Sequence, residues 1–131
     1  MTRHFAGEPG PLRAKPSGSI RVVRAFRASL RGLAGAYRAE AAFREELILA
    51  AVLIPLGLWL GRSGVERVVL TAAVLILLIA ELLNSAIEAA VDRIGPEHHA
   101  LSGLAKDIGS AAVFLAFVLL GGVWLIILLD R

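Results

Sequence analysis

The chain has 131 residues, of which 57% are hydrophobic, 19% are charged and none is cysteine. A soluble domain of this size leaves too much surface exposed to accommodate so many apolar side chains, and a disordered chain would contain far fewer of them. The absence of cysteine excludes disulfides, thiolate metal sites and cysteine nucleophiles. The net charge is only +3 at pH 7, but its distribution along the chain is uneven.

The N-terminal region divides into two parts. Residues 1–18 contain Pro9, Pro11 and Pro16 together with three glycines and have no apolar stretch, so they are predicted to be a flexible leader and not a signal peptide. Residues 20–38 place apolar side chains on one helical face and arginines on another. This pattern predicts an amphipathic helix that lies in the membrane interface, with its basic face toward anionic headgroups or phosphates.

Three apolar stretches follow. Residues 108–129 are uncharged, and as a helix they would be about 33 Å long, enough to cross a bilayer core of roughly 30 Å. Residues 47–61 are also uncharged and reach spanning length when extended back to Glu40. Residues 68–91 contain few polar groups. The sequence therefore predicts an all-α integral membrane protein: a membrane domain over 19–131 with spans at about 40–61, 65–91 and 107–129.

Basic residues predict the orientation of these spans. The residues up to Arg44 and the expected loop at 92–107 together carry eleven Lys or Arg, against three on the other side of the membrane. Short basic segments stay in the cytoplasm, so the N-terminus and the 92–107 loop are predicted to be cytoplasmic. No nucleic-acid partner is expected.

Polar residues of the second span form one stripe. A carboxylate at membrane depth costs about 2.5–3.5 kcal/mol on insertion scales, so such groups face protein or water. The stripe consists of Glu81, Asn84, Ser85, Glu88 and Asp92. Glu40 begins the first span, and Lys106 and Asp107 open the third, at the same cytoplasmic level. These side chains are expected to converge just inside that boundary.

Such a group of side chains suits phosphoryl transfer. Carboxylate oxygens are the ligands that Mg²⁺ prefers, a further carboxylate can accept a proton from a hydroxyl, and Lys or Arg can hold phosphate. No Walker A loop and no protein-kinase signature is present in the sequence. Two other interpretations remain open on these residues alone: structural ion pairs with Arg93 or Lys106, and a small proton-coupled transporter.

Three segments resemble the bacterial integral-membrane diacylglycerol kinase family, and the resemblance covers roughly residues 20–131. They are residues 40–46, 81–95 and 97–112, with Glu, Asn, Glu and Asp at the family's spacing in the second. The resemblance implies a homotrimer of three-span chains, each with an N-terminal surface helix, and active sites shared between neighbouring subunits. It also implies phosphorylation of diacylglycerol to phosphatidic acid by MgATP at the cytoplasmic face of the bacterial inner membrane.

The resemblance also implies roles for single residues. Glu81 would be the catalytic base on the lipid hydroxyl, and Glu40 and Glu88 would bind the metal. The residues implied to contact or order ATP are Arg21, Asn84, Glu97, His99, Lys106 and Asp107. Arg21 and Ser110 would also contact the lipid substrate. The related undecaprenol kinases, with the same fold and a polyprenol acceptor, are the nearest alternative.

Three residues depart from the family's pattern. Ala28 stands where a family tyrosine can contact nucleotide, and Leu30 and Tyr37 each replace a bulky aromatic residue of the surface helix. In the third span, Gly109, Ala112 and Ala116 form a stripe of small residues. Such a stripe allows helices to approach closely, either between subunits or within one subunit.

Overall fold

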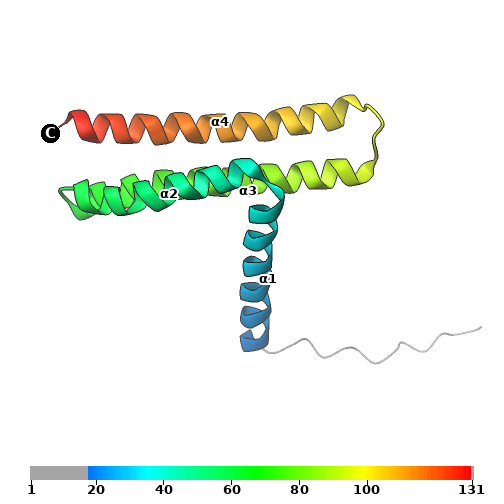
Figure 1. Cartoon of the computed structure of the whole chain (residues 1–131), viewed down its shortest axis with the longest axis horizontal. Coiled ribbons are helices and arrows are strands. Elements are labelled where there is room, and N and C mark those ends of the chain that lie inside the picture. The colour runs from blue at the N-terminus through cyan, green and yellow to red at the C-terminus, as the bar shows by residue number, and fades with distance from the viewer. Residues whose placement is uncertain (1–17, 131) are drawn as a thin grey trace, which may run out of the picture. The chain divides into compact units, whose positions relative to one another are not determined.

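The computed structural model describes residues 18–130, which form four helices in the order shown in Figure 1. The helices are α1 (Gly18–Ala39), α2 (Ala41–Leu60), α3 (Gly64–Ile94) and α4 (Ala100–Leu129). No strand occurs between residues 18 and 130, which agrees with the all-α class predicted from the sequence. Except for Gly18, the leader predicted at residues 1–18 lies outside the described residues.

The chain divides into two compact units after Gly32. In the described part of the first unit, residues 18–32 form most of α1, and none of the residues of α1 is buried. The apolar side chains of Val22, Phe26 and Leu30 are all at least half exposed. An exposed apolar face opposite a row of arginines is the property that an interfacial membrane helix requires.

The second unit is built around α3, which packs against both α2 and α4. Leu70, Val74 and Leu77 of α3 are almost completely buried, together with Ala50 of α2 and Leu120 of α4. Small residues allow the helices to approach closely. For example, a Cβ added to Gly57 of α2 would lie 3.1 Å from the Cβ of Leu70.

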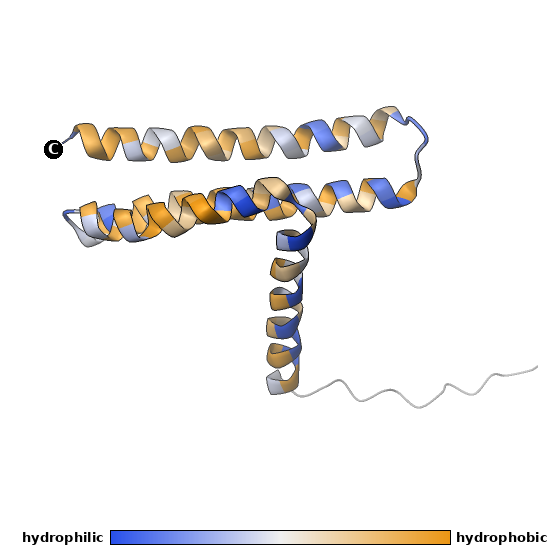
Figure 2. Cartoon of the chain, in the orientation of Figure 1, coloured by the Kyte–Doolittle hydropathy of each residue, from blue (hydrophilic) through white to orange (hydrophobic). Residues whose placement is uncertain are grey.

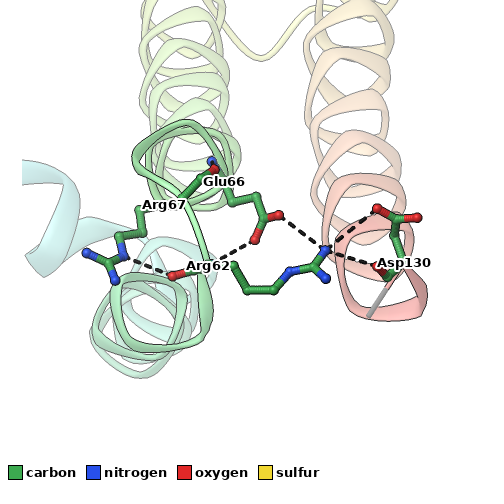
Figure 3. Close-up of polar contacts among 6 residues, drawn as sticks. Arg62, Glu66, Arg67 and Asp130 are labelled. Carbon is green, nitrogen blue, oxygen red and sulfur yellow. Dashed lines mark hydrogen bonds and ion pairs between the residues drawn. The ribbon is translucent and has the colours of Figure 1, made fainter.

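A group of ion pairs lies where α2, α3 and α4 come together at one end of this unit, as Figure 3 shows. Arg62, in the turn between α2 and α3, pairs with Glu66 at 3.3 Å and with Asp130 at 3.6 Å. Its guanidinium also donates a hydrogen bond to the Asp130 carbonyl at 3.0 Å. Ser63 caps α3 by accepting from the Glu66 amide. The contacts of Arg62 therefore link the α2–α3 turn to the end of α4.

The connection between α3 and α4 corrects one expectation. Residues 92–107 were expected to be a loop, but α3 continues to Ile94 and α4 already begins at Ala100. Gly95 has a φ of 141°, a conformation that side chains with a Cβ rarely adopt. His99 then caps α4, because its Nδ1 accepts a hydrogen bond from the Leu101 amide at 3.2 Å. Lys106 and Asp107 consequently lie in the second turn of a helix.

Two of the helices, α3 and α4, are long and apolar enough to cross a membrane. Figure 2 shows that apolar residues cover most of α4, and that polar residues of both helices lie near the end where the two are joined. Many apolar side chains of α4 point outward, among them Phe114, Leu115 and Ile126. A soluble protein would bury such side chains, so the chain is a membrane protein. Helix α2 is 20 residues long and carries Arg44, Glu45 and Glu46 near its start.

Candidate functional site

Glu40 lies at a sharp break between α1 and α2. Its backbone is extended, with φ −111° and ψ 118°, and it occupies the position that caps α2. Arg44 folds back across the break, and its Nη1 donates hydrogen bonds to the carbonyls of Tyr37 at 2.9 Å and Arg38 at 3.4 Å. These carbonyls belong to the last turn of α1, where no helical donor remains for them. The break therefore holds Glu40 at the beginning of α2.

A pocket of about 340 Å³ lies between the start of α2, the C-terminal half of α3 and the first turns of α4. We call it the carboxylate pocket. It is lined by Glu40, Ala42, Glu81, Asn84, Glu88, Ser110 and Val113. Both Glu81 and Asn84 are buried. Five of the residues singled out from the sequence are thus brought together from three helices.

Three carboxyl groups meet at this pocket. The Glu81 carboxylate interacts electrostatically with those of Glu40 and Glu88. Among residues 18–130, no ion pair joins any of the three to a Lys or Arg. Within the described residues, these three carboxylates therefore do not form the structural ion pairs considered from the sequence. Like charges held close together in a partly buried site favour the binding of a cation or of a proton.

Asn84 provides the hydrogen-bond donor of the pocket. Its Nδ2 donates to Glu88 Oε1 at 3.2 Å, one helical turn further along α3. Its Oδ1 is buried with no hydrogen-bond partner among the described residues, and the same is true of Ser85 Oγ. Across from Asn84 lies Gly109 of α4, which is also buried. The first residue of the small-residue stripe therefore packs within one subunit.

A second pocket, of about 420 Å³, adjoins the carboxylate pocket and shares Glu81 with it. Its remaining lining is largely apolar and includes Leu49, Val113 and Phe117. It also contains Glu46, which is only 6% exposed and whose Oε2 has no partner in the described structure. Glu81 is therefore accessible from a polar pocket and from a more apolar one.

Sequence reasoning assigned no role to Glu46. It belongs to the 40–46 segment but stands directly before an uncharged stretch, where a charge is ordinarily interpreted as lying at the membrane boundary. The available signal was its spacing from Glu40. Six residues along a helix is less than two turns, so both carboxylates remain near the same end of α2.

Three other predicted residues meet at the α3–α4 connection. Glu97, His99 and Lys106 line a smaller pocket of about 200 Å³ together with Asp92. The Lys106 ammonium forms an ion pair with Asp92 at 2.5 Å and interacts electrostatically with Glu88. The ion pair considered for Lys106 therefore exists, but with Asp92. Because His99 uses Nδ1 as a cap, its Nε2 is the nitrogen left to bind another group.

The remaining predicted residues are not part of these pockets. Asp107 is exposed on α4 and lines none of the three pockets described above. Arg21 is exposed on α1 and belongs to the first unit. Within residues 18–130, no three His, Asp or Glu side chains are arranged to hold a metal ion by themselves. Any metal at the carboxylate pocket would thus need ligands from a substrate or water.

Comparison with known proteins identifies the family to which this chain belongs. Residues 27–128 match the family model described as prokaryotic diacylglycerol kinase. A diacylglycerol kinase of Haemophilus influenzae is 47% identical over 110 residues, covering 84% of this chain and 93% of the relative. That of Pseudomonas aeruginosa is 47% identical over 122 residues, covering 93% and 98%. That of Escherichia coli K12 is 45% identical over 112 residues, covering 86% and 92%. This chain therefore belongs to the prokaryotic diacylglycerol kinase family.

Proposed function

We propose that the protein is a lipid kinase that transfers the γ-phosphoryl group of ATP to diacylglycerol and so produces phosphatidic acid. The observation that carries the proposal is the carboxylate pocket. It gathers acidic side chains that have no basic ion-pair partner among residues 18–130, inside a membrane protein of this family. The curated relatives with 45–47% identity are diacylglycerol kinases. Their coverage of most of the chain supports the same activity here.

The residues of the carboxylate pocket fit Mg²⁺. This cation is usually held by one or two carboxylates, with the remaining ligands supplied by water and substrate phosphates. Glu40 and Glu88 can supply the two carboxylates, since both line the pocket and have no ion-pair partner among residues 18–130. When bound, Mg²⁺ would neutralise charge on the ATP phosphates.

Glu81 would act as the catalytic base. Its carboxylate borders both the polar carboxylate pocket and the more apolar pocket that contains Leu49 and Phe117. A lipid hydroxyl entering from the apolar side would meet Glu81, which takes the proton as the lipid oxygen attacks the γ-phosphorus. The new O–P bond forms while the bond between that phosphorus and the β–γ bridging oxygen breaks, and ADP leaves with the electron pair.

The α3–α4 connection would bind the nucleotide. Glu97 and His99 line the same small pocket as Lys106, whose ammonium can offset charge on the phosphates. In the described structure Lys106 is paired with Asp92, so this role requires that it exchange or share that partner. Arg21 and Asp107 would also contact the nucleotide. Arg21 and Ser110 would contact the lipid substrate.

We further propose that three helices of each chain cross the inner membrane and that three chains form a homotrimer with shared active sites. Helix α2 is long enough to be the third span, at about 30 Å for its 20 residues. The N-terminus would be cytoplasmic, in keeping with the distribution of basic residues. The exposed apolar side chains of α2 and α4 supply surface for contacts with lipid and with neighbouring subunits.

A phosphate-transfer assay tests the proposal directly. Purified protein in detergent receives radiolabelled ATP and Mg²⁺ with diacylglycerol, with undecaprenol or with no lipid. We expect label in phosphatidic acid and little in the polyprenol. Label in undecaprenyl phosphate alone would assign the protein to the polyprenol kinases. ATP-independent proton movement in vesicles, with no labelled lipid, would instead favour a transporter.

A further inference from the structure

The Asn84 side chain differs in chemistry from the groups around it. It is a neutral amide among three carboxylates, and it is 9% exposed. A carboxylate can only accept hydrogen bonds, so the amide must turn its Nδ2 toward Glu88. The opposite amide orientation would set two acceptors against each other. Glu88 therefore determines which way the Asn84 amide points.

This orientation directs Asn84 Oδ1 toward α4. The nearest residue there is Gly109, and a Cβ built on Gly109 would collide with Oδ1 and lie 3.3 Å from Asn84 Cγ. The amide thus occupies the volume that any other side chain at position 109 would need. Other glycines of α4 are different: a Cβ added to Gly103, Gly121 or Gly122 meets no atom within 4 Å. The steric need for glycine is specific to position 109.

We propose that Gly109 and Asn84 are positioning residues that act through Glu88. The missing Cβ at Gly109 admits the amide between α3 and α4, and the amide holds the Glu88 carboxylate in the orientation in which it lines the pocket. The inference rests on the proposed function, in which Glu88 is a magnesium ligand. It also changes the expected role of Asn84, which would act on the nucleotide through Glu88 and not by direct contact.

The proposed effect on metal binding follows from the hydrogen bond between the Asn84 amide and the Glu88 carboxylate. A hydrogen-bond partner of this kind orients a metal ligand. Replacing such a partner costs about 10–100-fold in metal affinity or activity. In the described structure Asn84 donates to one Glu88 oxygen, Oε1, and Oε2 is the oxygen that can bind a cation. Because the amide is confined by Gly109 on one side, a single added methyl group at position 109 should displace it and release the carboxylate.

The experiment measures metal binding separately from catalysis. Mn²⁺ binding to the full-length protein is followed by electron paramagnetic resonance in the presence of a non-hydrolysable ATP analogue, without lipid. The variants are Gly109→Ala, Asn84→Ala, the double variant, and Gly121→Ala as a matched control on the same helix. In parallel, the Mg²⁺ concentration for half-maximal phosphate transfer and the KM for diacylglycerol are determined.

We expect Gly109→Ala and Asn84→Ala each to weaken Mn²⁺ binding by about 10–100-fold, with a matching increase in the Mg²⁺ requirement and an unchanged KM for diacylglycerol. The double variant should bind no more weakly than Asn84→Ala alone, because without the amide the added methyl group has nothing to displace. Gly121→Ala should behave as the unsubstituted protein does.

Other results overturn the inference. Gly109→Ala with normal Mn²⁺ affinity would remove the positioning role, as would additive losses in the double variant. If Gly109→Ala does not fold, the double variant should recover folding, and Asn84→Ala must still weaken Mn²⁺ binding; failure of either refutes the inference. An unsubstituted protein that binds Mn²⁺ but phosphorylates no lipid would contradict the proposed function and leave this comparison of variants valid.

Discussion

Glu81 is the residue on which the proposed chemistry depends most directly. It is buried between two pockets and surrounded by other carboxylates. We expect Glu81→Gln to lower the rate of phosphate transfer by about 10²–10⁴-fold, the usual contribution of a general base, without loss of folding. The rate is measured with saturating ATP, Mg²⁺ and diacylglycerol.

A matched control lies on the same helix. Glu66→Gln removes a carboxylate from the opposite end of α3, where it pairs with Arg62, and should leave the transfer rate nearly unchanged. A near-normal rate for Glu81→Gln would exclude Glu81 as the base. If Glu81→Gln and Glu66→Gln lowered the transfer rate equally, the loss would come from an effect of removing a charge from α3 on folding, and not from an effect on the chemical step.

Glu46 illustrates a conflict between stability and function. Its side chain is 6% exposed, and Oε2 has no partner among the described residues. A buried polar group without a hydrogen bond costs about 1–3 kcal/mol. We therefore expect Glu46→Leu to raise the midpoint of thermal unfolding in detergent and, because Glu46 shares a pocket with Glu81, to lower the transfer rate. A lower midpoint would show that Glu46 has a stabilising partner in the assembled protein.

Trp124 joins two helices through a single polar contact. Its Nε1 donates a hydrogen bond to the Leu70 carbonyl at 3.3 Å, in the buried core between α3 and α4. We expect Trp124→Phe to lower the free energy of unfolding by about 1 kcal/mol or more, since both the hydrogen bond and part of the packing are lost. Trp59, which is 78% exposed on α2, provides the control, and Trp59→Phe should have a smaller effect. Equal effects would contradict the assignment of Trp124 to the core.

The helices show which features of the fold can be predicted from sequence patterns. The stripe of Glu81, Asn84 and Glu88 was predictable because a helix places residues three and four apart on the same face. Uncharged stretches likewise indicated α3 and α4. The bounds of the α3–α4 connection were not predictable from hydropathy, because a charged helical turn outside the apolar stretch resembles a loop. The local signals were Gly95 and His99, which end one helix and cap the next.

The contacts between helices could not be derived from the sequence. Gly109 belonged to a stripe of small residues that fitted either a subunit contact or internal packing, and periodicity does not say which helix a face meets. The structure places it against Asn84. Glu46 was missed for a similar reason, since burial depends on neighbouring helices and not on the residue's own helix. The fold class was therefore more predictable than the detailed lining of the site.

The orientation of the whole molecule can be tested because the chain contains no cysteine. Single cysteines are introduced at two exposed positions: Val65, at the start of α3, and His98, in the connection that follows the other end of α3. A membrane-impermeant maleimide applied to spheroplasts should label Val65→Cys, and should label His98→Cys only after the membrane is broken. The reverse pattern would invert the proposed orientation. Labelling of both positions in intact spheroplasts would show that α3 does not cross the membrane.

The proposed trimer leads to a test of shared active sites. If the surface helix of one chain serves the site of its neighbour, Arg21→Glu and Glu81→Gln each inactivate the homotrimer for different reasons. Coexpression of the two variants would then produce some sites with an intact Arg21 from one chain and an intact Glu81 from the next. Random assembly in equal amounts should restore about a quarter of the sites, as cyclic symmetry requires.

The oligomer is first measured by light scattering in detergent, where a trimer has three times the 13.9 kDa of one chain. Recovery of activity in a mixed trimer, but not when the two variants are purified separately and combined without exchange, would support sharing between neighbours. A trimer of the correct mass that recovers no activity would place both residues in the site of a single chain. Since Arg21 and Glu81 belong to different compact units, this result would also show that each surface helix serves the carboxylate pocket of its own chain.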